Sequence, residues 1–255
     1  MNVKDKLKLT ADLLLDISSL LMVSGANTNR INLSLTRFAS ALNCQAYSMV
    51  THMTLVLTVT DIETEETFTR VKKIPKYQIN FSTISAISKA SWSALREDWT
   101  LARIKEEFDV IKTRTRYPKY IVLIAVSFAG AGFCNIFEGD YINMLVAFFS
   151  TLLGLFILQT AHDRKINGHI ATFLASFFAS FFASIGVFYN LGEHPQAALA
   201  TSVLFLVPGV ALINSFTDFL DNNILNGMVR FANGTMTVLS IALGLFVAML
   251  LFQLN

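Results

Sequence analysis

Long apolar runs occupy the second part of the chain, and shorter amphipathic segments occupy the first. After Tyr117-Pro118, five apolar runs follow one another with only short polar stretches between them, at about 119–137, 141–160, 168–189, 198–216 and 228–252. Each run approaches or exceeds the ~20 residues that a helix needs to cross the hydrocarbon core of a membrane. The pattern therefore predicts a domain of residues 116–255 with five transmembrane helices.

The first 115 residues show shorter and mixed periods. Apolar residues recur at helical spacing in four segments, at 13–23, 29–42, 80–95 and 100–111. A strand-like run covers residues 45–61, and residues 67–72 indicate a partner strand. The predicted fold class is an α-helical integral membrane protein with five transmembrane helices and an N-terminal cytoplasmic α+β domain, residues 1–115, which is long enough to bury its own core.

Composition strengthens this division. Hydrophobic residues make up 53% of the chain and charged residues only 15%, against about a quarter in a soluble domain. Residues 1–119 hold 17 of the 20 Lys and Arg, whereas residues 120–255 hold 18 of the 22 Phe. These values exclude a purely soluble enzyme, a coiled coil and a disordered chain. The basic part also carries many acidic residues, so no nucleic-acid partner is expected.

No catalytic or metal-binding pattern stands out. Cys44 lies in the polar part and Cys134 in an apolar run, so both are expected to be free thiols. His162, Asp163 and His169 match no standard metal-site spacing, and a solvated loop is favoured over metal ligation. Gly-x-Ser-x-Gly and His-Glu-x-x-His motifs are absent. The sequence therefore predicts no enzyme activity, no metal and no cofactor.

Basic residues beside the apolar runs give the expected orientation. They precede the first run, follow the second and follow the fourth: Arg114, Arg116, Lys119, Arg164, Lys165 and Arg230. The polar stretches on the other side have no Lys or Arg. By the positive-inside rule, the N-terminus is cytoplasmic and the C-terminus lies outside.

An odd number of helices cannot form two equal repeats within one chain, although many secondary transporters pair two repeats around a central site. We therefore expect the chain to oligomerise or to need a second membrane protein. Small residues that allow close helix contact support this interpretation. They are Ala129-Gly130-Ala131-Gly132 in the first run and Ala171, Ala175, Ala179 and Ala183 in the third.

The fourth run holds the richest group of candidate path residues. Pro208 and Gly209 can kink or open a helix there, because proline lacks a backbone N–H. Asn214, Ser215 and Asp218 follow at helical spacing, with Asn214 and Asp218 on one face. That face can bind a substrate ammonium group or carry a proton. The alternative is a packing kink, with Asp218 at the cytoplasmic interface.

Other polar residues of the apolar part are weaker candidates. Arg230 can pair with Asp218 or Asp221, or it can anchor the fifth run at the interface. Asn135 and Asn143 lie near the outer ends of the first and second runs and are included as path residues. In the polar part, the acidic group at residues 61–66 is favoured as a solvated turn, with ion sensing as the alternative.

Several short motifs, in order along nearly the whole chain, resemble the threonine/serine exporter (ThrE-type) family. They are Gly25-Ala26-Asn27-Thr28-Asn29-Arg30, Arg116-Tyr117-Pro118, Gly132-Phe133-Cys134, Val207-Pro208-Gly209, Leu212-Ile213-Asn214, Asp218, Gly227 and Arg230. Within the family, the chain is most similar to the longer (YjjP-like) subunit of a split form that works with a separate short membrane subunit. It departs from the family at Asp221-Asn222-Asn223, where members more often carry a Gly-Asp turn.

The resemblance implies a subunit of a proton-driven exporter in the cytoplasmic (inner) membrane of a bacterium, with a second small membrane subunit as partner. Its substrates would be small hydrophilic metabolites, either amino acids such as threonine and serine or a small dicarboxylate such as succinate. Gly25 and Arg30 are implied to cap a helix and tie the domain to cytoplasmic loops; alternatively, Arg30 binds a substrate carboxylate. The rival interpretation is a non-transporting receptor or scaffold whose soluble domain senses a ligand.

Overall fold

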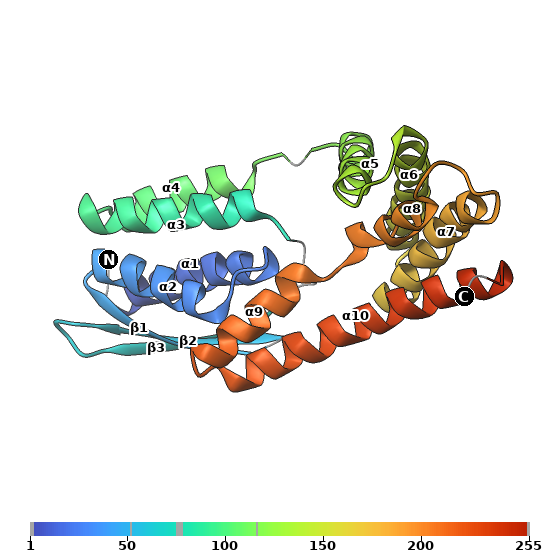
Figure 1. Ribbon diagram of the computed structural model, residues 1–255. Helices are drawn as coiled ribbons and strands as arrows, with labels where there is room; N and C mark the ends of the chain where they lie inside the picture. Colours follow the sequence, from blue (N-terminus) through green and yellow to red (C-terminus); the bar gives the residue numbers. More distant parts are fainter. Residues whose placement is uncertain (1–2, 52, 75–78, 116, 254–255) are drawn as a thin grey trace. The chain divides into compact units, whose positions relative to one another are not determined.

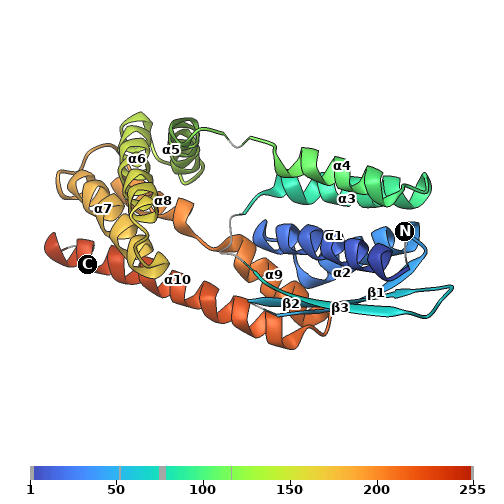
Figure 2. The same ribbon diagram turned by 180° about the vertical axis from the view of Figure 1, so that it is seen from behind.

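The computed structural model describes residues 3–51, 53–74, 79–115 and 117–253. Arg116, which the sequence assigns to the cytoplasmic side and to a family motif, lies outside these residues. The chain is mostly helical, with a small three-stranded sheet near its N-terminus (Figures 1 and 2). It divides into two compact units. The first combines Met1–Thr115 with Val210–Phe231, and the second combines Arg116–Gly209 with Ala232–Asn255.

The first unit is an α+β domain. Its N-terminal elements are α1 (Val3–Val23), α2 (Thr28–Ala41), β1 (Cys44–Val50), β2 (Thr54–Asp61), β3 (Thr67–Lys73), α3 (Phe81–Arg96) and α4 (Leu101–Lys112). The strand-like run at 45–61 is thus two strands with a turn between them. The unit also contains α9 (Gly209–Leu220) from Val210 onward and the first part of α10 (Ile224–Leu251).

The sheet is an antiparallel meander in the order β1-β2-β3. Every second residue of β2 points to the interior, where Leu55, Leu57 and Val59 are buried. Helices α1 and α2 cover this face (Figure 1). Helix α1 is buried along most of its length, because its apolar face meets the sheet and the other helices. One hydrophobic core therefore joins the sheet to α1–α4.

The second unit is helical. Its elements are α5 (Lys119–Ile136), α6 (Tyr141–Asp163), α7 (Gly168–Phe188), α8 (Pro195–Thr201), the 3-10 turn η1 (Leu204–Leu206) and the later part of α10. Among the described residues, four helices are long and apolar enough to cross a membrane: α5, α6, α7 and α10. The number is five if the bent pair Pro195–Leu206 and Gly209–Leu220 counts as one span.

The fourth expected span, residues 198–216, is not a single helix. The helix stops before Pro208, and Val207 takes an extended conformation with φ −59° and ψ 124°. Proline disfavours the helical conformation of the residue before it and removes a backbone donor, so the break falls where the sequence indicates. The polar stretch expected at 217–227 is mostly helical as well, with only a short turn between α9 and α10.

Small residues bring the helices of the second unit close together. Ala171, Ala175, Ala179 and Ala183 on α7 are all fully buried. Gly154 of α6 lies against this row, since a Cβ added there would be 2.8 Å from the Ala179 Cβ. On α7, the Ser176 hydroxyl donates to the Ile241 carbonyl of α10 at 2.7 Å. Helix contact in this unit therefore depends on small side chains and interhelical hydrogen bonds.

Candidate functional site

The candidate site begins at the sharp connection between α1 and α2. Helix α1 ends in a Schellman arrangement, in which Gly25 N–H donates to the Met22 carbonyl and Ala26 N–H to the Leu21 carbonyl. Gly25 has φ +92°, a conformation that side chains other than glycine rarely adopt. Asn27 then caps α2 by accepting a hydrogen bond from Arg30 N–H at 2.8 Å. The connection therefore places the Gly25 and Ala26 carbonyl groups beside the positive N-terminus of α2.

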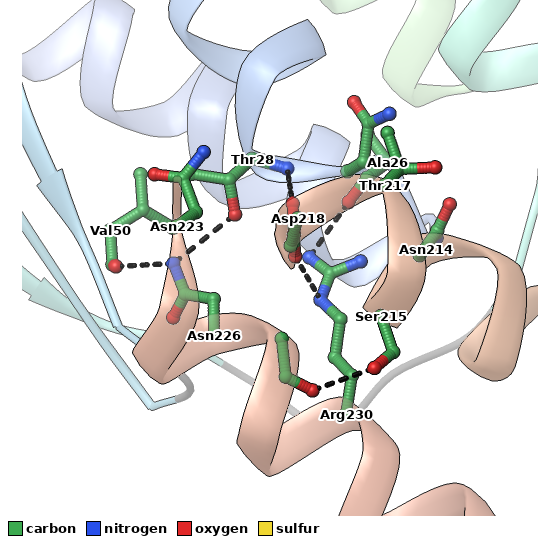
Figure 3. Close-up of polar contacts among 12 residues, drawn as sticks. Ala26, Thr28, Val50, Asn214, Ser215, Thr217, Asp218, Asn223, Asn226 and Arg230 are labelled. Atoms are coloured by element: carbon green, nitrogen blue, oxygen red, sulfur yellow. Dashed lines mark hydrogen bonds and ion pairs between the residues drawn. The ribbon is translucent and has the colours of Figure 1, made fainter. Parts of the chain in front are cut away.

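Asp218 and Arg230 bind this connection from α9 and α10 (Figure 3). The Thr28 N–H donates to Asp218 Oδ1 at 3.0 Å, and Arg230 Nη2 donates to the Ala26 carbonyl at 2.9 Å. Arg230 Nε lies 3.1 Å from Asp218 Oδ2. Asp218 is fully buried and Arg230 is only 8% exposed. The two residues form a buried ion pair, which we call the Asp218–Arg230 clamp together with its contacts to Ala26 and Thr28.

Two asparagines extend the clamp on either side. Asn214 Nδ2 donates to the Gly25 carbonyl at 2.7 Å. Asn226 Nδ2 donates to the Val50 carbonyl at 2.8 Å and to Thr28 Oγ1 at 3.1 Å. The polar face of α9 and the start of α10 therefore satisfy backbone groups of the α1–α2 connection and of the end of β1.

The turn between α9 and α10 is held by its own contacts. The Ser215 hydroxyl donates to the Gly227 carbonyl at 2.8 Å. A Cβ on Gly227 would lie 2.7 Å from the Phe219 ring, so any other residue would displace that ring. Asp221, the alternative partner for Arg230, is exposed. Arg230 therefore pairs with Asp218.

The electrostatics of the clamp account for the burial of two charges. Asp218 lies where an anion is favoured, at the N-terminus of α2 and beside a guanidinium group. Its Oδ1 accepts a hydrogen bond from the Thr28 N–H. Its Oδ2 lies at ion-pair distance from Arg230 but forms no hydrogen bond with it. Both oxygens thus already have a positive partner. In this arrangement the carboxylate is a structural anion and not an open site for a substrate ammonium group.

The other candidate residues are distributed over the chain. Pro208 and Gly209 form the break before α9. Asn143 is fully buried at the start of α6, where its Nδ2 donates to the Leu191 carbonyl at 2.7 Å and its Oδ1 accepts from His194 N–H at 3.0 Å. It therefore fastens the 190–194 loop. Asn135 is exposed.

Arg30 and the possible metal ligands take no part in the clamp. Arg30 is exposed, and only its backbone N–H contributes to the α2 cap. Within the described residues, no three His, Cys, Asp or Glu side chains lie close enough together to hold a metal ion.

Sequence reasoning missed Asn226 and Thr28 as parts of the clamp and Asn27 as the cap of α2. A signal for Asn226 was present, because it lies one helical turn before Arg230 and so faces the same way. Asn27 is a favourable cap residue before an amphipathic helix. Thr28 contributes mainly its backbone N–H, for which the sequence offers no signal.

Among the described residues of the α+β domain, two ionisable groups have shifted pKa values. Burial raises the pKa of the Cys44 thiol, and the nearby Asp61 carboxylate adds to the effect. The pKa of Asp61 is lowered, mainly because the Thr64 backbone N–H donates to its carboxylate. Asp61 Oδ1 also accepts from Glu63 N–H. The acidic group is thus organised as a hydrogen-bonded turn.

Most of the chain, including the clamp, matches one protein family. Residues 12–252 match the family model ThrE, described as "Putative threonine/serine exporter". The chain belongs to the threonine/serine exporter family. This match includes the α+β domain, the clamp and all the candidate membrane helices. The chain is therefore a multi-pass membrane protein of a transporter family.

Two curated relatives are similar over almost the full length. "Probable succinate transporter subunit YjjP" of Klebsiella aerogenes is 27% identical over 240 residues, which cover 92% of this chain and 91% of the relative. The protein of the same name from Escherichia coli K12 is 25% identical over the same lengths. No solved structure gives a significant match.

Proposed function

We propose that this chain is one subunit of a proton-driven exporter of small hydrophilic metabolites, working with a second, short membrane subunit in the inner membrane. The observation that carries the proposal is the family match over residues 12–252. The relatives' description as transporter subunits supports a partner. The N-terminal domain is then cytoplasmic and the C-terminus outside, in agreement with the positions of the basic residues.

The substrate is either an amino acid such as threonine or serine, or a small dicarboxylate. The family description favours the former, and the relatives' name, which includes succinate, favours the latter. A dicarboxylate needs convergent cations, yet Arg230 is already paired with Asp218. Lys119, at the start of α5, is paired with Asp163. A dicarboxylate path would therefore take its cations from the second subunit.

The fourth span has two separable roles in this proposal. The break at Pro208-Gly209 lines or gates the substrate path, because an interrupted helix frees backbone carbonyls that a polar substrate can use. The Asp218–Arg230 clamp fixes α9 and α10 to the α+β domain. Proton coupling through Asp218 then requires that its ion pair opens during transport, since both carboxylate oxygens have partners in the closed arrangement.

The first experiment is to define the complex and then to measure export. The tagged chain is extracted in mild detergent from its native host, and stoichiometric companions are identified together with the particle mass. The complex is reconstituted in proteoliposomes with threonine, serine or succinate inside and an imposed proton gradient. Gradient-dependent efflux that an uncoupler abolishes supports the proposal. No efflux of any of the three, from a complex that contains its companion, contradicts it.

The rival function is a receptor or scaffold, and one observation favours it. Asn214, Asp218 and Arg230 all have structural partners in the α1–α2 connection, so a membrane anchor also has a use for them. Pro208→Ala discriminates between the two functions better than Asp218→Asn does. Pro208→Ala alters the helix break without removing a clamp contact, whereas Asp218→Asn changes the clamp itself. Loss of efflux in an intact Pro208→Ala complex supports export, and unaltered efflux contradicts the gating role.

A further inference from the structure

A polar groove separates α3 from α4 in the α+β domain. Its cavity volume is about 450 Å³, which falls within the range of small-molecule sites, roughly 300–1,000 Å³. The two helices lie side by side in both ribbon views (Figures 1 and 2). The lining side chains from α3 recur at intervals of three or four residues, so they form one continuous face of the helix.

Small side chains on α3 keep the groove open. Ser82, Ser85 and Ser93 line it together with Ala86 and Ala90. Serine and alanine side chains are too small to fill the space between the two helices. The serine hydroxyls also offer hydrogen-bond donors and acceptors to this space. The groove is thus polar and large enough for a metabolite.

Among the described residues, three cationic side chains and one carboxylate line this space. Lys89 comes from α3, Arg103 from α4, and Arg114 follows the end of α4, whereas Glu107 is the single acid. Among the residues that the structure describes, no ion pair joins Lys89 or Arg114 to a carboxylate. Arg103 pairs with Glu106, which is not a lining residue. The groove therefore carries an excess of positive charge.

The N-terminal end of α3 adds to this positive character. Asn80 caps the helix at Thr83 N–H, and Ser82 lies in the first turn, where backbone N–H groups have no partner within the helix. Arg114 lines the same groove. Serine hydroxyls, an arginine fork and a helix N-terminus are the groups that bind carboxylate and phosphate oxygens in proteins.

We propose that the α3–α4 groove binds a small metabolite through its carboxylate or phosphate oxygens. Lys89 and Arg114 supply the charge, Ser82 and Ser85 supply hydrogen bonds, and Trp99 forms part of the wall. The site belongs entirely to the α+β domain, so this inference does not rest on the proposed export activity. It gives the domain a ligand-binding role of its own.

Trp99 provides the means to test the proposal. The chain has two tryptophans, and Trp92 is 44% exposed and stacked on Arg37 outside the groove. Trp92→Phe therefore leaves Trp99 as the single tryptophan. The full-length Trp92→Phe chain is placed in nanodiscs of neutral lipid and titrated with succinate and with inorganic phosphate. We expect a saturable change in fluorescence with at least one of the two anions.

Matched charge variants locate the site. Lys89→Gln and Arg114→Gln each remove one lining cation and are expected to raise the Kd about tenfold, since each loses a charge-assisted contact. Lys105→Gln removes the same charge from an exposed position of α4 that does not line the groove. It is expected to change the Kd by less than about twofold. If all three variants weaken anion binding equally, the binding depends on the general surface charge and not on this groove, and the proposal is overturned.

Nanodiscs that contain anionic lipid distinguish a free metabolite from a lipid headgroup. If the headgroup is the source of the oxygens, Trp99 fluorescence in these discs is already shifted, and Arg114→Gln reverses the shift. If a free metabolite is the source, the titration with soluble anion persists in both kinds of disc. Absence of any response to succinate, phosphate or anionic lipid overturns the proposal, provided that the variant keeps the secondary structure of the parent chain.

Discussion

Asp218→Asn removes the negative charge from the centre of the clamp while retaining its shape. The asparagine keeps one oxygen for the Thr28 N–H, so that hydrogen bond survives. Arg230 remains 8% exposed, with the Ala26 carbonyl as its partner and no carboxylate beside it. Removing one member of a buried pair costs about 3–5 kcal/mol, because the remaining charge stays buried and uncompensated. We expect a value near 3 kcal/mol, at the lower end of this range.

This free energy applies to local opening of the α9–α10 segment away from the α1–α2 connection. A loss of about 3 kcal/mol in the free energy of local opening raises the equilibrium constant for opening more than 100-fold. Hydrogen–deuterium exchange of the detergent-solubilised chain measures it directly, because amides that exchange through local opening report that equilibrium. Peptides covering residues 24–30 and 214–230 are expected to lose protection to this extent, whereas those covering β2 keep theirs.

Two further variants test the physical reason. Asp12→Asn breaks an exposed pair, in which Asp12 lies 3.1 Å from Arg70 and both side chains are more than 40% exposed; the expected cost is below about 1 kcal/mol. The double variant Asp218→Asn, Arg230→Met removes both buried charges. It is expected to cost at least about 1 kcal/mol less than the sum of the single variants. Exchange in Asp218→Asn no faster than in Asp12→Asn would refute the reasoning.

Three further predictions concern positions away from the clamp. Gly192→Ala is expected to lower the Tm and to reduce the free energy of unfolding by about 1–3 kcal/mol. The reason is that Gly192 has φ +81° and that the new Cβ would lie 2.5 Å from Asp140 Oδ1. Gly168→Ala is the control, because a Cβ at Gly168 has open space around it. The folded pKa of Asp61 is lowered below its unfolded value of about 3.9. Asp61 therefore stabilises the domain above that pH, and this contribution is lost as the pH falls through the folded pKa. Asp61→Asn should accordingly be less stable than the parent at pH 6, and the difference should shrink on acidification to about pH 2; a difference in denaturation midpoint that is the same at both pH values would contradict this. Burial raises the Cys44 pKa, so maleimide labelling at pH 7 followed by mass spectrometry should be much slower in the folded chain than in urea; equal rates would contradict the buried position.

The elements of the α+β domain follow from local patterns. In β2, Leu55, Leu57 and Val59 alternate with half-buried positions, and the side-chain period of a strand places all three on one face. Helical periods likewise locate α2, α3 and α4 to within a few residues. The turn that divides residues 45–61 into two strands was not predicted, because both halves have the same strand-like composition and the break contains neither glycine nor proline.

The contacts of the candidate site could not be predicted from local sequence patterns. Its residue types and helical spacing were visible in the sequence, including the break at Pro208 and the shared face of Asn214 and Asp218. A polar face on an apolar helix is equally consistent with a substrate path and with a protein contact. The choice depends on what lies opposite. For Asp218 that is the Thr28 N–H, 190 positions away in the chain.

The sequence by itself determined the apolar helices, the mixed α+β domain and the family. These properties depend on composition and on periods of two or 3.6 residues, which the backbone geometry imposes on neighbouring positions. Only the tertiary structure decided that Arg230 pairs with Asp218, that Asn143 fastens a loop, and that Lys89, Arg103 and Arg114 face one groove. Each of these depends on contacts between segments distant in sequence, and a lysine or arginine on a helix looks the same in sequence whether it faces solvent or a site.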